Sequence, residues 1–260
     1  MQLGRAQTFV HGPRIPITYG ARVFVTPSRR RIYLLRHAEA AYYDDNLVRA
    51  ADPRQVPLSP LGRVQARKQA AILASIDFDR AICSGLPRTV ETARAILGSR
   101  ETALEIEPQL EEIRGGERPD DVADSDWIAH IANPWAGAEI AGARFIGGER
   151  FSDFSARVPP AFDAIVAQDN WSTLLLVLHG AVNRRLLNHV MGLAFTGGMS
   201  IEQDNACINV LDVDTAADGT VSRYLIRAIN ITGYDLNKSG VTLTTMELSA
   251  QRQAAELAGT

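Results

Sequence analysis

The sequence predicts an α/β fold with three layers, in which helices cover both faces of a mostly parallel central sheet. Along the 260 residues, short apolar runs alternate with segments of helical periodicity. Strands that alternate with helices form parallel sheets covered on both sides. The chain is 46% hydrophobic, and its longest apolar run, residues 174–178, is far too short to cross a bilayer. We therefore expect a substantial core in a protein that does not span a membrane.

The first strand–helix pair lies near the N-terminal end of the periodic region. The run "RIYLLRH" (31–37) is typical of a buried strand. A helix is predicted over 59–76, since Ser59 can cap it and Pro60 suits its first position. The apolar residues expected on one face of this helix are Leu61, Val64, Ala71, Ile72 and Ile76.

The second pair follows directly. Residues 78–85 predict a strand, and residues 86–97 predict a helix with Pro87 in its first turn and Gly98 just after its end. After an irregular stretch, residues 150–168 indicate another helix. The pair Pro159-Pro160 predicts a break in that helix.

The C-terminal half continues the alternation. Residues 172–180 predict a fully buried strand, and residues 181–193 predict the helix that follows it. Residues 206–214 and 222–230 predict two strands joined around the turn "AADG".

The predicted domain organisation has one main unit and two ends. Residues 29–235 are expected to form the main domain, with a lid insertion over about 114–148. Residues 1–28, punctuated by Gly and Pro, are predicted as an N-terminal extension, and residues 236–260 as a C-terminal tail with a helix-prone end. Each end is expected to be either mobile or a strap on the surface.

Composition narrows the classes of partner. The formal net charge of −3 gives no reason to expect nucleic acid or a membrane surface, and the short basic run 29–31 is expected to be solvated. The N-terminus has no apolar segment typical of a signal peptide, so a cytoplasmic location is expected. Cys83 and Cys207 are predicted as buried thiols. Five scattered histidines show no metal-ligand spacing, so no metal or other cofactor is expected.

Three strand-to-helix junctions carry unusual residues. Arg36 and His37 end the first strand, Arg88 lies in the first turn of a helix, and His179-Gly180 ends the strand 172–180. Ligands of open α/β sheets bind at such junctions. Guanidinium groups bind phosphate oxygens in pairs, helix N-termini present free N–H groups, and a neutral imidazole can attack phosphorus. Together these residues point to a phosphoryl group as the ligand.

Four motifs in this order resemble those of the histidine phosphatase superfamily, also called the phosphoglycerate mutase-like family. They are "LLRHAEA" (34–40), "PLSPLGRVQA" (57–66), "SGLPRTVETA" (84–93) and "VLHGAVNR" (177–184). Two weaker matches are "LEEIRGG" (110–116) and "GGERFSDFSARV" (147–158). The resemblance covers roughly residues 31–233.

The resemblance implies a role for each matching residue. His37 would be the nucleophile that forms a phosphohistidine. Arg36, Arg88 and His179, with Gly180, would bind the phosphoryl oxygens and stabilise the transition state. Glu112 would be the general acid and base. No metal would be required, because the two guanidiniums and His179 supply positive charge.

Some positions depart from the family pattern or are open. Ala38 stands where most members have Gly, and Glu111 could be mistaken for the acid by a shift of one residue. Tyr42, Tyr43 and Asn46 are alternative phosphate contacts, among which the sequence does not choose. Glu149, in the second weak motif, is expected to be structural.

Among members of the family, the chain resembles a phosphatase, of the histidine acid type, acting on a small phosphomonoester. The residues after the first motif lack the Trp-containing pattern of cofactor-dependent mutases. A mutase, a phosphoprotein phosphatase and a non-catalytic phosphate-binding regulatory module stay open, as does a homodimer. The lid holds two basic and five acidic residues between positions 114 and 135, which disfavours polyanionic substrates. Its apolar residues, expected either to pack the insertion or to face substrate, are Trp127, His130, Ile131 and Trp135.

Overall fold

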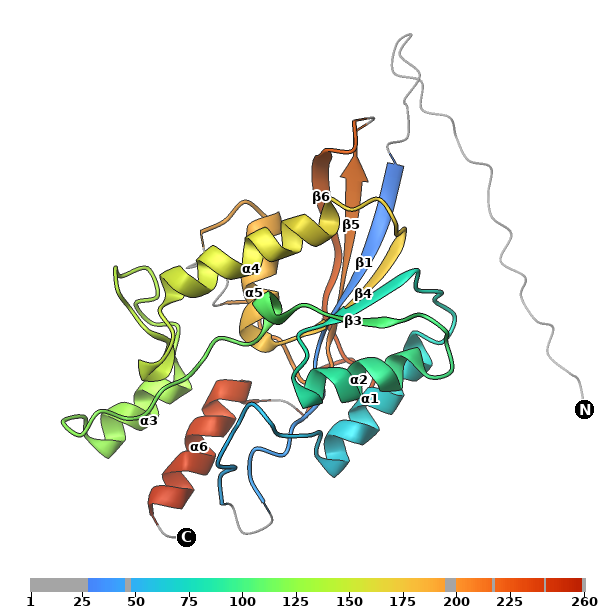
Figure 1. Cartoon of the computed structure of the whole chain (residues 1–260). Helices are drawn as coiled ribbons and strands as arrows, with labels where there is room; N and C mark the ends of the chain where they lie inside the picture. Colours follow the sequence, from blue (N-terminus) through green and yellow to red (C-terminus); the bar gives the residue numbers. More distant parts are fainter. Residues whose placement is uncertain (1–27, 45–47, 195–199, 217, 241, 259–260) are drawn as a thin grey trace, which may run out of the picture.

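The computed structural model describes residues 28–258 except 45–47, 195–199, 217 and 241. Its centre is a six-stranded mixed sheet in the order β3-β2-β4-β1-β5-β6 (Figure 1). The strands are β1 (Ser28–Arg36), β2 (Arg80–Cys83), β3 (Leu104–Ile106), β4 (Thr173–Leu178), β5 (Ile208–Thr215) and β6 (Val221–Ile231). The first four positions of the sheet pair in parallel, and β5 and β6 are antiparallel. The predicted α/β class is confirmed.

Helices cover both faces of this sheet (Figure 1). The helices α1 (Pro60–Ile72) and α2 (Pro87–Leu97) lie on one side, and α4 (Phe151–Val166) and α5 (Gly180–Val190) on the other. The strand β4 shows why: Leu174, Leu176 and Leu178 belong to the core under α4 and α5, while Leu175 and Val177 belong to the core under α2. Successive side chains of a strand point to opposite faces, so an uninterrupted apolar run fills both layers.

Two further helices lie together away from the sheet. The helix α3 (Asp124–Ala132) lies within residues 114–148, the segment predicted as a lid, and α6 (Thr245–Leu257) lies near the C-terminus. Figure 1 shows them side by side, and Trp127 and Ile131 of α3 pack with Ala250 of α6. Of two short 3₁₀ turns, η1 (Pro108–Leu110) precedes this segment and η2 (Phe145–Gly147) lies at its end. No helix in the described part of the chain is long and apolar enough to cross a membrane.

The predicted apolar face of α1 is wrong. Its large members Leu61, Val64 and Ile72 are exposed, and the buried positions are Gly62, Gln65, Ala66 and Gln69. The reason is close packing on loops rather than on the sheet. A Cβ atom at Gly62 would lie 2.0 Å from the Glu39 carbonyl oxygen, and Gln65 accepts a hydrogen bond from the Glu39 N–H. Small residues and amides suit such contacts with polar backbone.

The predicted break in α4 is also wrong, because the helix continues through Pro159 and Pro160. Its inner face is completely buried at Phe154, Val158 and Phe162. Burial of three such side chains contributes roughly 5 kcal/mol or more, which offsets the hydrogen bonds that prolines remove.

The basic run 29–31 was expected to be solvated, but it is part of β1. Arg30 is buried and donates to the carbonyl oxygens of Val166 and Gln168. Arg29 and Arg31 form ion pairs with Asp214 and Asp212 of β5. The predicted boundaries of other elements differ from the observed ones by a few residues, as helix and strand ends commonly do. Cys83 and Cys207 are free and buried, as predicted.

Candidate active site

The three predicted junctions meet at one edge of the sheet. Strands β2, β4 and β1 are neighbours and parallel, so their carboxyl ends lie side by side. Arg36 is the last residue of β1, His179 is the N-cap of α5 after β4, and Arg88 lies in the first turn of α2 after β2. The ring centroids of His37 and His179 are 5.2 Å apart.

His37 is held in one tautomer by its own loop. Its ring is 2% exposed, and its Nδ1 lies 2.7 Å from the carbonyl oxygen of Ala38. A carbonyl oxygen only accepts hydrogen bonds, so Nδ1 carries the proton. Nε2 therefore keeps its lone pair, as a nucleophile requires.

His179 is held in the matching way by a chain of hydroxyls. The Thr89 hydroxyl donates to the Leu86 carbonyl, at 2.8 Å. The Ser84 hydroxyl, 3.0 Å away, must then donate to Thr89 and accept from His179 Nε2, which is 2.7 Å distant. Nδ1 of His179 is buried and has no hydrogen-bond partner among the described residues. This nitrogen is free to meet a ligand.

Both imidazoles are neutral in the absence of an anion. Burial, and after it the positive charges of Arg88 and Arg36, hold the pKa of His37 well below its usual value. Burial and Arg88 likewise lower the pKa of His179, with smaller effects from His37 and Arg36. A bound phosphoryl group would oppose these effects and favour a proton on His179.

The two arginines are oriented by neutral oxygens. Arg36 Nη1 donates to the Gln203 carbonyl at 2.5 Å and to the Thr245 hydroxyl at 2.8 Å. Arg88 Nη1 donates to the carbonyls of residues 53 and 54. Both side chains are over nine-tenths buried, both Nε atoms lack a hydrogen-bond partner, and no ion pair joins either guanidinium to a carboxylate in the described chain. Buried cations without a counter-ion favour an anionic ligand.

Gly180, also predicted for the site, is the first residue of α5 and lies next to Arg36. A Cβ atom at this position would lie 3.4 Å from Arg36 Nε and 3.6 Å from Cζ, which is ordinary van der Waals contact. The spacing therefore leaves room for a methyl group here.

The two neighbouring glutamates point to different partners. Glu112 is half-buried, and its carboxylate accepts from the N–H groups of Ala181 at 3.2 Å and Ile113 at 3.1 Å. Ala181 lies in the first turn of α5, two residues after His179, which is predicted to bind the phosphoryl group. Glu111 instead pairs with Arg54 at 2.6 Å. Geometry thus brings Glu112, and not Glu111, to the helix that His179 caps.

Arg157, which holds the backbone around Glu112, is not among the site residues predicted from the sequence. Arg157 donates to the carbonyl oxygens of Gln109, Glu111 and Glu112 and pairs with Glu149 at 2.8 Å. This clamp fixes the backbone that carries Glu112. Glu149 is structural, as expected, but Arg157 in the same motif was not singled out, because its partners are carbonyl oxygens that leave no side-chain pattern.

Tyr42 and Tyr43, two of the alternative phosphate contacts, have different partners in the structure. Arg88 lies over the ring of Tyr42, 5.6 Å from its centroid, and burial raises the pKa of Tyr42. Tyr43 instead lies against Arg252 of α6, 5.9 Å away. Asn46 falls outside the described residues. Of the two tyrosines, Tyr42 is therefore the one that contacts an arginine of the candidate site.

The apolar residues of the lid pack inside the protein. Trp127, Ile131 and Trp135 are each less than a tenth exposed, and His130 lies against Trp127. Of the two expectations for this set, packing of the insertion is the one observed. Within the described chain, no group of three or more His, Cys, Asp or Glu side chains could hold a metal ion.

The site thus combines two arginines, two histidines with lowered pKa values and a carboxylate at the carboxyl edge of the mixed sheet of an α/β protein. Residues 32–224 match the model of the histidine phosphatase superfamily (branch 1). The chain belongs to that superfamily.

Curated relatives include phosphatases and mutases. The chain is 27% identical over 190 residues to the adenosylcobalamin/alpha-ribazole phosphatase of Escherichia coli (strain K12), covering 71% of this chain and 90% of that protein. It is also 27% identical over 188 residues to a probable phosphoglycerate mutase GpmB of Enterobacter sp. (strain 638), covering 70% of this chain and 84% of that protein. Among solved structures, the alpha-ribazole phosphatase of Shigella flexneri has a TM-score of 0.61 and 26% identity, covering 77% of this chain and 96% of the other.

Proposed function

We propose that this protein is a metal-independent phosphomonoester hydrolase that works through a phosphohistidine on His37. The observation that carries the proposal is the pair of buried arginines without counter-ions beside two neutral imidazoles. Such a group is costly to bury unless an anion completes it. A phosphatase activity also agrees with the named activity of the Escherichia coli relative.

The first chemical step transfers the phosphoryl group to the protein. His37 Nε2 attacks phosphorus, and the bond from phosphorus to the ester oxygen breaks. Protonated Glu112 gives its proton to the departing oxygen, so an alcohol leaves. Arg36, Arg88 and His179 stabilise the negative charge on the three remaining phosphoryl oxygens.

The second step returns the protein to its starting state. Glu112, now a carboxylate, accepts a proton from a water molecule that attacks the phosphorus of the phosphohistidine. The phosphorus–nitrogen bond breaks, inorganic phosphate leaves, and His37 Nε2 regains its lone pair. Both steps use only this chain's own residues.

The proposed substrate is a small phosphomonoester with an uncharged or basic organic part. The five acidic residues of the lid against two basic ones support this, since they would repel polyanions. The buried tryptophans of the lid do not contribute to the choice, so specificity rests on polar residues and on Tyr42.

The test is turnover of p-nitrophenyl phosphate by the purified protein in excess EDTA, followed by a panel of phosphomonoesters. Sustained turnover supports the proposal. Activity that disappears in EDTA and returns with magnesium or zinc would overturn the metal-free mechanism. A protein that binds phosphate but turns over no ester would be a binding module, and one that only moves phosphate between hydroxyls of phosphoglycerate would be a mutase.

A further inference from the structure

The segment after β6, residues 232–257, lies beyond the end of the family match at residue 224. It nevertheless reaches the catalytic arginine. We propose that Thr245, at the start of α6, is a positioning residue that orients Arg36 for the phosphoryl group. This inference rests on the proposed function and adds to it a residue outside the part of the chain that defines the family.

The contact forms one link of a directed chain. Arg36 Nη1 donates to Thr245 Oγ1 at 2.8 Å, and the Thr245 hydroxyl donates onward to Glu202 Oε1 at 3.4 Å. The other oxygen of Glu202 pairs with Arg184, at 2.7 Å. The hydroxyl thus accepts from the guanidinium while its own proton is committed elsewhere.

A neutral partner matters here because of charge. If Glu202 paired directly with Arg36, its carboxylate would compete with a substrate phosphate for the same guanidinium. Thr245 separates the two groups by one hydroxyl, and Arg184 binds the glutamate charge. Arg36 is therefore held in place without being neutralised.

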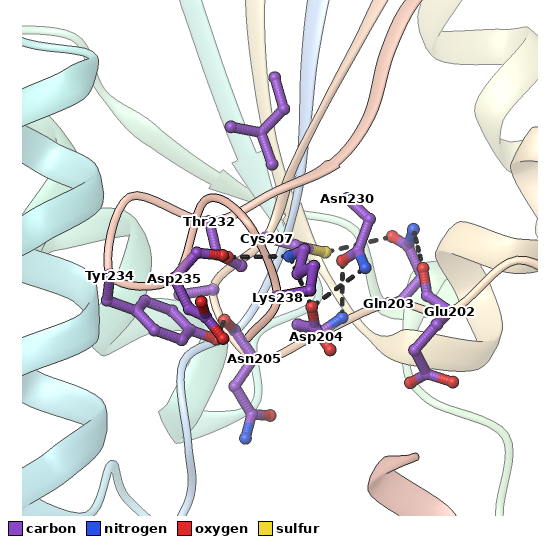
Figure 2. Close-up of polar contacts among 12 residues, drawn as sticks. Glu202, Gln203, Asp204, Asn205, Cys207, Asn230, Thr232, Tyr234, Asp235 and Lys238 are labelled. Carbon is purple, nitrogen blue, oxygen red and sulfur yellow. Dashed lines mark hydrogen bonds and ion pairs between the residues drawn. The ribbon is translucent and has the colours of Figure 1, made fainter. Parts of the chain in front are cut away.

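The chain between β6 and α6 is held by a group of residues that we call the C-terminal anchor, shown in Figure 2. Lys238 Nζ lies 2.6 Å from an Asp204 carboxylate oxygen and 2.8 Å from the Thr232 hydroxyl. The Asp204 backbone N–H donates to the Asn230 side-chain oxygen, and the Asn230 side-chain amide donates to the Asp204 carboxylate. The Tyr234 hydroxyl donates to the Asn205 carbonyl at 2.6 Å. The members of the anchor are Asp204, Asn205, Asn230, Thr232, Tyr234 and Lys238.

The backbone of this region is unusual in two ways. Among the described residues, four that are not glycine have a positive φ, and three of them, Ala206 (57°), Asn230 (55°) and Lys238 (57°), lie in or next to the anchor. Such conformations persist only where the surroundings enforce them, and they gather at functional sites. In addition, Ala206 N–H donates to the His37 carbonyl at 3.0 Å. The residue that follows Asn205 of the anchor is therefore bonded to the backbone of the proposed nucleophile.

The inner face of α6 packs against α3. Ala250 and Met246 pack with Trp127 and Ile131 of α3, and Arg252 lies against Tyr43. The helix therefore joins three parts of the proposed site: the arginine at the end of β1, the lid, and the loop after His37. Its first turn is fixed from both sides.

The test compares two adjacent threonines. Thr244 is the N-cap of α6 and forms a capping box with Glu247, so Thr244→Val weakens the helix without touching Arg36. Thr245→Val removes the hydroxyl on Arg36 and keeps the shape. We expect Thr245→Val to lower kcat/KM by roughly 10-fold and to weaken binding of inorganic phosphate similarly, since hydrogen bonds to charged groups are among the stronger ones. Thr245→Ser should recover most of both.

Thr244→Val should lower thermal stability more than Thr245→Val does, while its kcat/KM stays within about twofold of the parent. The inference is overturned if Thr245→Val matches the parent protein in kcat/KM and phosphate affinity, or if Thr244→Val loses as much. Failure of the Thr245 inference is distinguishable from failure of the proposed function. If the parent protein hydrolyses no ester, the proposed function fails whatever the variants do, whereas calorimetric binding of inorganic phosphate to the variants still tests the role of Thr245.

Discussion

The strand β1 carries arginines at both ends, and the two ends treat them in opposite ways. At its start, Arg29 and Arg31 reach Asp214 and Asp212 with two hydrogen bonds each. At its end, Arg36 is held by a carbonyl and a hydroxyl. The same strand therefore holds arginines that are paired with carboxylates and an arginine whose partners are neutral oxygens.

At the start of the strand, charge is balanced within the sheet. Asp214 also pairs with Arg223 and Asp212 with Arg227, both on β6. The neighbouring guanidiniums lower the pKa of both carboxyls. Such ion pairs join three strands and leave nothing for a ligand to complete, whereas Arg36 and Arg88 lie among neutral groups and lowered-pKa histidines. The lack of a carboxylate partner is not distinctive by itself, because Arg30 of the same strand is also buried and held by carbonyl oxygens. Arg36 and Arg88 differ from Arg30 in lying close to the two histidines.

The strongest test of this contrast removes the nucleophile. His37→Ala should lower turnover by roughly 10⁴-fold or more, because it removes the proposed nucleophile. His189→Ala is the matched control, since His189 pairs with Asp163 near the far end of α5. The measurement is p-nitrophenyl phosphate turnover together with acid-labile, base-stable phosphate label on the quenched protein. Label retained on the His37→Ala protein would contradict the assignment.

The next effect concerns the two glutamates. Glu112→Gln should lower turnover of esters with poor leaving groups by roughly 10²–10⁴-fold, and less for p-nitrophenyl phosphate. Glu111→Gln should cost far less, because the Glu111 carboxylate pairs with Arg54 and Arg114. Its link to the site is indirect, through the Arg54 carbonyl, which accepts from Arg88. Rates across esters of graded leaving-group pKa measure the difference. The reverse order of the two variants would make Glu111 the acid.

A smaller effect is expected from the hydroxyl behind His179. Ser84→Ala removes the acceptor that holds the Nε2–H tautomer, and kcat/KM should fall roughly 10-fold. The acid limb of the kcat/KM profile should also move, which a purely structural change would not cause. Ser152→Ala, at an exposed position of α4, is the control. An unchanged profile with full activity would show that the tautomer of His179 is set elsewhere.

The smallest effect on turnover is expected at the other end of β1. Asp212→Asn should change kcat/KM by less than about twofold and lower Tm by roughly 5 °C, since it removes the charge between two arginines. The pKa of the Asp212 carboxyl is lowered in the folded protein, so its stabilisation is present above the unfolded value of about 4 and is lost as pH falls toward the folded value.

The histidines act in a separate pH window. The pKa values of His37 and His179 are lowered in the folded protein, so the unfolded chain binds protons first and stability falls as pH drops below about 6.5. Melting curves from pH 8 to pH 3 should therefore show two regions of loss. Asp212→Asn should reduce only the lower one, to which Asp214 also contributes. If it also removed the upper one, the two ends would be electrostatically coupled.

Local pattern determined much of this protein. The apolar run of β4, the Ser59-Pro60 start of α1 and the Pro87 and Gly98 limits of α2 follow from burial and capping, which depend on neighbours in sequence. The same is true of the site's main residues, because strand ends next to helix starts in a parallel sheet must meet at one edge. Arg36, His37, Arg88 and His179 could therefore be named together before any coordinates were known.

Tertiary structure alone decided which charged groups have partners. Arg29 and Asp214 are 185 positions apart, and Arg36 and Thr245 are 209 apart. Nothing in the residues near Arg36 indicates that a threonine from the last helix will contact it. Likewise, the inner face of α1 is polar and small because it meets the Glu39 loop, and Arg157 binds backbone carbonyls that every residue possesses. Burial periodicity is a property of one segment, whereas a hydrogen bond between distant segments exists only once the chain has folded.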